Sequence, residues 1–160
     1  MDRISSQVEF SFQNLRSTVE DPGESWQLLL RIVASFSTSL SGRQFYIESE
    51  FPVVEFASQA AKWLRTGGDF IYISMESEED PLLGFYRVGN DQFRPYVAHS
   101  LFADSALVDA KELFVRLSWF VESVVSCSKS KLELDVQHFC YRRDESALVW
   151  GERRDENAPK

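Results

Sequence analysis

Apolar and polar side chains alternate along the N-terminal third of the chain, a period typical of β-strands. Residues 7–15 show this alternation, and residues 26–36 show it again with apolar side chains at every even position. Residues 43–51 resume the pattern after Gly42, so the sequence predicts a hairpin between the last two strands.

Two later segments carry apolar side chains at spacings of three and four, which predicts amphipathic helices. The first helix is expected over about 52–66, because Pro52 suits a first helical turn and a Gly-Gly pair follows the last apolar position. The polar side chains of this helix, Glu55 among them, are expected to face solvent. The second helix is expected over about 105–128.

Three shorter strands are expected between the helices. The third contains Pro95, which predicts an edge or an irregular position in a sheet. Residues 132–140 alternate once more and predict a last strand, which would place His138 and Cys140 on one face.

This order of elements predicts an α+β fold. The short connections favour a single, mainly antiparallel sheet of about five to seven strands, with both helices packed on one face. Residues 1–150 are expected to form one domain. Residues 151–160 have no apolar period and are expected to form a flexible C-terminal tail.

Charge narrows the classes of function. The chain has 160 residues and a net charge of −8, and residues 44–112 hold twelve Asp or Glu against five Lys or Arg. Such a field repels nucleic acids and anionic membranes and attracts basic surfaces. The N-terminus lacks a secretory signal pattern, no apolar run is long enough to span a membrane, and only two cysteines occur, so a cytoplasmic location is expected.

The candidate ligands for a metal are few and poorly spaced. They are His99, Cys127, His138 and Cys140, and no two of them have the spacing of a zinc site. Signatures of nucleotide-binding loops, hydrolases and metalloproteases are missing from the sequence. We therefore expect no metal, no cofactor and no enzymatic activity, although a small enzyme with catalytic groups distant in sequence stays open as an alternative.

A cluster of carboxylates interrupts the strands in the segment SMESEEDPLLGF, residues 74–85. This acidic segment contains Glu76, Glu78, Glu79 and Asp80. One interpretation is a solvated turn whose charges discourage edge-to-edge aggregation. The other is a docking loop for a basic partner, in a patch that Glu48, Glu50, Glu55 and Asp91 would extend.

Two tryptophans lie off the main apolar stripes of the expected helices. Trp63 is placed at the edge of the first, and Val115 and Trp119 at the edge of the second. Such residues line the margin of a core or act as aromatic anchors in an interface. A homo-oligomeric structural or regulatory module, in contact around Trp119, is therefore a further alternative.

The succession of elements over residues 40–125 resembles small acidic immunity proteins encoded beside bacterial polymorphic toxins. The resemblance lies in ESEFPVVEF at 48–56, FIYISME at 70–76 and DPLLGF at 80–85. It implies a non-enzymatic protein that binds a cognate toxin and occludes its active site through an acidic surface. The partner-binding residues that it implies are Glu76, Glu78, Glu79, Asp80 and Asp91, with Glu48 and Glu50 as a second group.

Overall fold

The computed structural model describes residues 6–22, 27–75, 82–98 and 106–141. Within these ranges the chain forms seven strands and four helices. In chain order they are β1 (Val8–Ser17), α1 (Gln27–Arg31), β2 (Ile32–Leu40), β3 (Arg43–Phe51), α2 (Val53–Thr66), β4 (Phe70–Tyr72), β5 (Leu83–Val88), β6 (Gln92–Val97), β7 (Val108–Asp109), α3 (Ala110–Leu132) and α4 (Gln137–Cys140). The α+β class predicted from the sequence is confirmed.

The first sheet has the order β1-β2-β3 and is antiparallel throughout. Strands β2 and β3 form the predicted hairpin, with Ser41 and Gly42 at its tip. Both tip residues have positive φ, 48° and 79°, which matches the right-handed twist of a two-residue hairpin.

The second sheet has the order β4-β5-β6-β7 and is also antiparallel. Strand β7 pairs only with Gln92 and Phe93 of β6. Pro95, two residues further on, pairs with Phe85 of β5 and lies beyond β7, so its missing N–H leaves no gap in a ladder. Strand β6 is thus an inner strand of the sheet, and the predicted edge position holds only for its second half, which contains Pro95.

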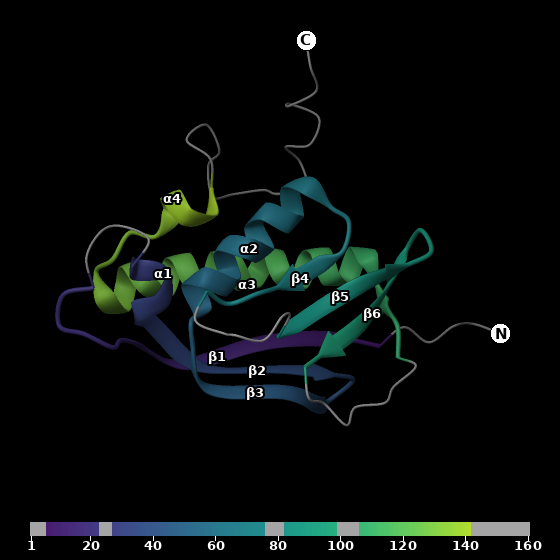
Figure 1. Ribbon diagram of the computed structural model, residues 1–160, viewed down its shortest axis with the longest axis horizontal. Coiled ribbons are helices and arrows are strands. Elements are labelled where there is room, and N and C mark those ends of the chain that lie inside the picture. Colours follow the sequence, from purple (N-terminus) through teal and green to yellow (C-terminus); the bar gives the residue numbers. More distant parts are fainter. Residues whose placement is uncertain (1–5, 23–26, 76–81, 99–105, 142–160) are drawn as a thin grey trace, which may run out of the picture.

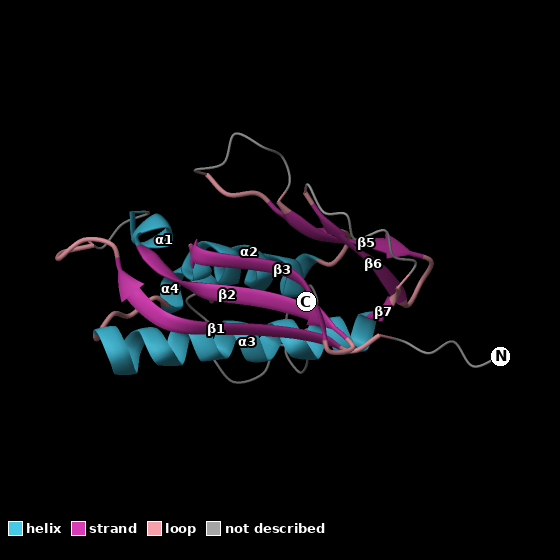
Figure 2. Ribbon diagram, turned by 90° about the horizontal axis from the view of Figure 1, so that it is seen from below, coloured by secondary structure: helices cyan, strands magenta, loops and turns pink. Residues whose placement is uncertain are grey.

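The single sheet predicted from the sequence is wrong, because the strands divide into sheets of three and four. Helices α2 and α3 pack against the first sheet, α2 on β2 and α3 on β1, while the second sheet contacts α2 through β4 and α3 through β7 (Figures 1 and 2). The physical reason lies in α2, where nine of fourteen residues are buried. A helix with so wide an apolar surface needs cover on more than one side, and the second sheet supplies it.

Rings from both sheets and both long helices meet at Phe56 of α2. Among the described residues, six rings have centroids within 6.1 Å of its own, those of Phe10, Phe36, Phe51, Phe70, Tyr72 and Phe120. Phe85 of the second sheet also contacts Phe10 and Phe45 of the first, at 5.8 and 6.4 Å. The two sheets therefore share one aromatic core.

Two predicted strand segments are helical. Residues 27–31 form α1, because the leucine run at 28–30 satisfies either period and leucine is a strong helix former. Residues 137–140 form α4, and its N-cap Val136 and its last residue Cys140, which are four apart, are both buried. Helix α3 begins at Ala110, five residues after its predicted start, because Val108 and Asp109 pair with β6 as a strand, and it continues to Leu132, four residues past its predicted end.

The described helices include none that is long and apolar enough to cross a membrane. The predicted tail at 151–160 lies outside the described residues.

Candidate functional site

The predicted partner-binding carboxylates fall into two groups. Glu76, Glu78, Glu79 and Asp80 lie outside the described residues. The others are all exposed: Glu48 and Glu50 on β3, and Asp91 in the turn between β5 and β6.

The described carboxylates belong to different sheets and make local contacts. Glu48 accepts a hydrogen bond from the backbone N–H of Ser49 at 3.1 Å, and Glu50 forms an ion pair with Arg16 at 3.5 Å. The backbone carbonyl of Asp91 accepts from the N–H of Ala110 at 2.8 Å. Nothing in these contacts joins the two β3 carboxylates to Asp91 in one patch.

The strongest anchoring near the acidic segment comes from Glu55, which is buried with only 2% of its surface exposed. The prediction that it faces solvent is wrong. Its carboxyl group accepts a hydrogen bond from the Tyr72 hydroxyl at 2.7 Å and another from the Met75 backbone N–H at 3.0 Å. Burial, and then the adjacent Glu55, raise the pKa of Tyr72, so its hydroxyl keeps the proton that it donates.

Gln59, one turn along α2, holds the same stretch of chain. Its side chain donates to the carbonyl of Ile73 at 2.7 Å and accepts from the Ile73 N–H at 3.1 Å. On the far side of the acidic segment, the N–H of Leu82 donates to the carbonyl of Tyr72 at 3.0 Å. The residues on both sides of the acidic segment are thus fixed to α2 and to the second sheet.

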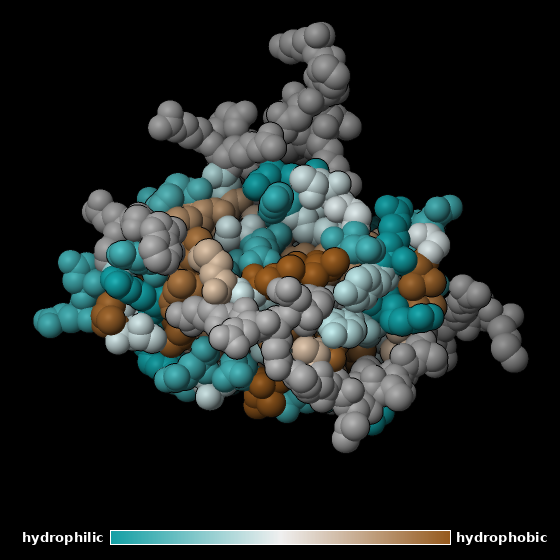
Figure 3. Space-filling view, viewed as in Figure 1, coloured by the Kyte–Doolittle hydropathy of each residue, from teal (hydrophilic) through white to brown (hydrophobic). Residues whose placement is uncertain are grey.

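Apolar side chains project outward from the strand that leads into the acidic segment. Ile71, Ile73 and Met75 are 37%, 43% and 56% exposed. The register places Ile71 opposite Gly84, and Gly84 opposite Tyr96, which is 38% exposed. Figure 3 shows hydrophobic side chains gathered over β4 in the middle of this face of the molecule.

We refer to Ile71, Ile73, Met75, Tyr86 and Tyr96 as the outer patch. The rings of Tyr86 and Tyr96 pack edge to face at 5.7 Å. Gly84 lies between Ile71 and Tyr96, and a Cβ there would come within 2.9 Å of the Phe70 carbonyl oxygen. The missing side chain leaves this part of the sheet surface flat between Ile71 and Tyr96.

Sequence reasoning missed the outer patch, although a signal was present. An antiparallel strand with one solvated face should alternate apolar and polar side chains. In FIYISM at 70–75, the side chains on both faces of the strand are largely apolar. Phe70 and Tyr72 lie on one face, and Ile71, Ile73 and Met75 lie on the other. A strand that is apolar on both faces needs a second cover, and the described residues leave the outer face exposed.

A second exposed aromatic residue lies on α3. Trp119 is 56% exposed, and the guanidinium carbon of Arg116 lies 5.3 Å from the centre of its ring. Val115 is half-buried at the margin of the core, whereas Trp63 is buried at 8% exposure. The homo-oligomeric alternative would have its contact around Trp119.

Three of the groups considered for metal binding or nucleophilic catalysis, Cys127, His138 and Cys140, do not form a common site, and the fourth, His99, lies outside the described residues. Cys140 is fully buried, and burial raises the pKa of its thiol to about 12, with Arg65 acting in the opposite direction. His138, in the same turn of α4, is exposed, and Cys127 lies on α3. Among the described residues no group of three or more His, Cys, Asp or Glu is placed to hold a metal ion.

Comparison with known proteins gives a family without an assigned activity. Searches of curated proteins and of solved structures found no match to this chain. The family described as a domain of unknown function, DUF7878, matches residues 8–126, a span that runs from β1 into α3 and contains both sheets and the outer patch. The chain belongs to this family.

Proposed function

We propose that this protein is a non-enzymatic binding domain that recognises a basic protein through the outer patch and the acidic segment beside it. The observation that carries the proposal is the run of exposed Ile71, Ile73 and Met75, which leads directly into the four carboxylates of residues 76–80. An apolar centre with charged residues at its side is the usual composition of a specific protein interface.

The two parts of this surface have different roles. Burial of the outer patch supplies affinity, since apolar area removed from water contributes about 25 cal/mol per Å². The carboxylates attract a basic partner from a distance and orient it, which affects the association rate more than the dissociation rate. Glu55 and Gln59 hold the backbone at 73–75, so less conformational freedom is lost on binding.

The resemblance to immunity proteins supplies the kind of partner. On that basis the occupant is a bacterial toxin with a basic cleft for an anionic substrate, and its neutralisation is occlusion of that cleft. Residues 44–112 contain twelve carboxylates against five basic side chains, and this negative charge supports a partner whose surface is positively charged. Glu48, Glu50 and Asp91 belong to this proposal as peripheral contacts that add long-range attraction.

The test begins with the toxin candidate encoded beside this gene, produced as a catalytically inactive variant. Binding is measured by surface plasmon resonance at several salt concentrations. Replacing Glu78, Glu79 and Asp80 by Lys should reduce the association rate constant about tenfold or more at low salt and flatten its salt dependence. Ile73→Lys should mainly raise the dissociation rate constant, because it places a charge in the apolar centre.

The matched control reverses three exposed carboxylates elsewhere, Glu9, Glu20 and Glu133, so that the net charge changes equally. If this control slows association as much as the reversal of the acidic segment, only net charge matters and the proposed surface is wrong. A neighbouring toxin that binds with unchanged kinetics to Ile73→Lys would likewise remove the outer patch from the interface.

A further inference from the structure

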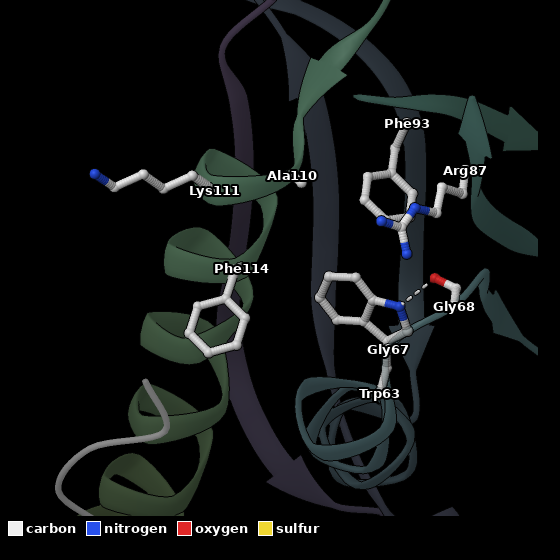
Figure 4. A pocket seen from close by; sticks show the side chains of 8 residues that line it. All are labelled: Trp63, Gly67, Gly68, Arg87, Phe93, Ala110, Lys111 and Phe114. Atoms are coloured by element: carbon white, nitrogen blue, oxygen red, sulfur yellow. Dashed lines mark hydrogen bonds between the residues drawn. The ribbon is translucent and has the colours of Figure 1, made fainter. Parts of the chain in front are cut away.

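A hollow of about 330 Å³ opens where three elements meet, on a surface separate from the outer patch. The end of α2 contributes Trp63 and the glycines that follow it, the second sheet contributes Arg87 and Phe93, and the start of α3 contributes Phe114 (Figure 4). Its volume lies at the small end of the range for ligand pockets, about 300–1,000 Å³.

Two aromatic side chains of the hollow, Trp63 and Phe93, are held in fixed orientations. The indole N–H of Trp63 donates to the carbonyl of Gly68 at 2.8 Å, and its ring packs edge to face on Phe93 at 5.6 Å. Gly67 and Gly68 both have positive φ, 71° and 83°, the conformation that turns the Gly68 carbonyl back to the indole. Because that bond uses the indole N–H, Trp63 offers a ligand its ring and no hydrogen bond.

Arg87 supplies a positive charge at the same place. Its Nε donates to the carbonyl of Gly89 at 3.2 Å and one of its terminal nitrogens donates to that of Asn90 at 2.8 Å. Figure 4 shows the guanidinium beside the ring of Phe93, on the side toward Trp63. Both bonds go to backbone carbonyls, and the described residues contain no carboxylate in an ion pair with it.

The other charges near the hollow are less well placed. The carboxylate of Asp69 accepts a hydrogen bond from the Arg87 backbone N–H at 2.7 Å through one of its oxygens. Lys111 is exposed, and Figure 4 shows its side chain extending away from Trp63. Arg87 is therefore the charge that a ligand between Trp63 and Phe114 would meet.

We propose that this hollow binds a small aromatic carboxylate. The ring of the ligand packs between Trp63 and Phe114, where aromatic pairs add to the area buried. Its carboxylate receives hydrogen bonds from the terminal N–H groups of Arg87 that the contacts with Gly89 and Asn90 leave free, and a planar guanidinium suits a carboxylate better than a lysine would. The proposal adds a small-molecule site to the chain and does not depend on the proposed protein partner.

The experiment is a titration of the full-length, ¹⁵N-labelled chain with phenylacetate, followed through the indole N–H signal of Trp63. Saturable shifts are expected with a Kd on the order of 1 mM or tighter for so small a ligand. Phenylacetamide, which has the same shape without the charge, and cyclohexylacetate, which has the charge without the aromatic ring, should both bind at least about fivefold more weakly.

Two variants and a control locate the site. Arg87→Gln should weaken binding about tenfold or more, whereas Arg94→Gln, an exposed arginine on the neighbouring strand, should leave it unchanged. Ala110→Leu places a larger side chain at the wall of the hollow and should abolish binding. Amide spectra report whether each variant is folded, and Ala110→Leu tests the site without touching the Arg87 hydrogen bonds.

The proposal is overturned if phenylacetate gives no saturable shift up to its solubility limit, or if phenylacetamide binds equally well. Equal losses in Arg87→Gln and Arg94→Gln would also overturn it, since the effect would then come from net charge. Partner binding measured with Ala110→Leu should be unchanged, so failure here leaves the proposed function standing, and failure of the proposed function leaves this site standing.

Discussion

At the scale of single residues, Glu55 joins helix α2 to the strand ahead of the acidic segment. We predict that Glu55→Ala lowers the free energy of unfolding by about 2–4 kcal/mol, because the buried Tyr72 hydroxyl and the Met75 N–H lose their acceptor and each orphaned group costs about 1–3 kcal/mol. Urea denaturation measures the change. Glu50→Ala, at an exposed carboxylate, is the matched control and should shift stability by less than about 1 kcal/mol.

Tyr72→Phe separates the two hydrogen bonds of Glu55. It removes one donor and keeps the ring in the core, so a smaller loss of about 1–2 kcal/mol is expected. A loss equal to that of Glu55→Ala would contradict the view that Glu55 also stabilises the backbone at Met75.

Cys140 gives stability a dependence on alkaline pH. Its thiol has a folded-state pKa of about 12 against an ordinary value of 9.0, because burial disfavours the thiolate. The raised pKa contributes stability that is fully present below pH 9 and is lost as the pH rises toward 12, at up to about 1.4 kcal/mol per pH unit.

Cys140→Ala removes the titrating thiol from both states. Its unfolding free energy, measured by urea denaturation between pH 8 and pH 10.5, should therefore fall less steeply with pH than that of the unmodified chain. Identical slopes in the two proteins would show that Cys140 does not contribute.

At the scale of elements, the end of α3 contains a backbone conformation that its residue does not favour. Glu133 has φ 55°, in the left-handed region, and the N–H groups of Glu133 and Leu134 donate to the carbonyls of Lys129 and Ser128. The bond from Glu133 to Lys129 is that of the αL motif at a helix C-terminus, in which glycine is the preferred residue. We predict that Glu133→Gly stabilises the protein by about 0.5–1 kcal/mol, measured as a rise in Tm.

The control for this prediction is Glu133→Ala, which removes the same charge and keeps the Cβ. It should not stabilise the protein, so the difference between the Gly and Ala variants isolates the backbone conformation. Equal Tm values for the two variants would mean that the carboxylate, and not the backbone, sets the effect.

The elements also show what the sequence can and cannot reveal. The hairpin around Gly42 and the helix after Pro52 are predicted well, because turn residues and a clear period coincide there. Residues 28–30 satisfy both periods, so periodicity alone could not identify α1. The acidic segment is visible in the sequence, but its anchoring by Glu55 is not, because a carboxyl group on a helix is ordinarily assigned to solvent.

The division into two sheets is likewise a tertiary outcome. Strand periodicity says which face of each strand is apolar, but not which strands pair. Here β4 follows α2 and pairs with β5, while α2 lies against β2 of the first sheet. The sequence did contain one indication. Apolar residues lie on several sides of α2, Val53, Ala57 and Ala61 among them, and they are buried in the structure, so one sheet could not cover them all.

At the scale of the whole molecule, Phe56 connects both sheets to both long helices. We predict that Phe56→Ala lowers the free energy of unfolding by about 3–5 kcal/mol, since it leaves a large cavity among six rings. Hydrogen exchange should show amides of β2 and β5 losing protection together. Loss confined to one sheet would mean that the sheets unfold as separate units.

Phe114→Ala is the matched control for this change. Phe114 is a half-buried phenylalanine on α3 at the wall of the hollow, so its removal should cost clearly less than that of Phe56. A similar loss in the free energy of unfolding for both variants would mean that Phe56 contributes no more to the core than Phe114 does.

The anchoring of residues 73–75 and Leu82 has a consequence for how such a domain can diversify. Residues 73–75 and Leu82 are held by hydrogen bonds to Glu55, Gln59 and the Tyr72 carbonyl. None of these groups belongs to residues 76–81. Lengthening a surface connection costs only about 0.6 kcal/mol for each doubling. The interval between the anchors is therefore a place where sequence and length can be exchanged at little cost to the fold. Under the proposed function, a scaffold of this kind would acquire a new partner by replacing one short insert, and the same interval is a suitable position for grafting a designed recognition peptide.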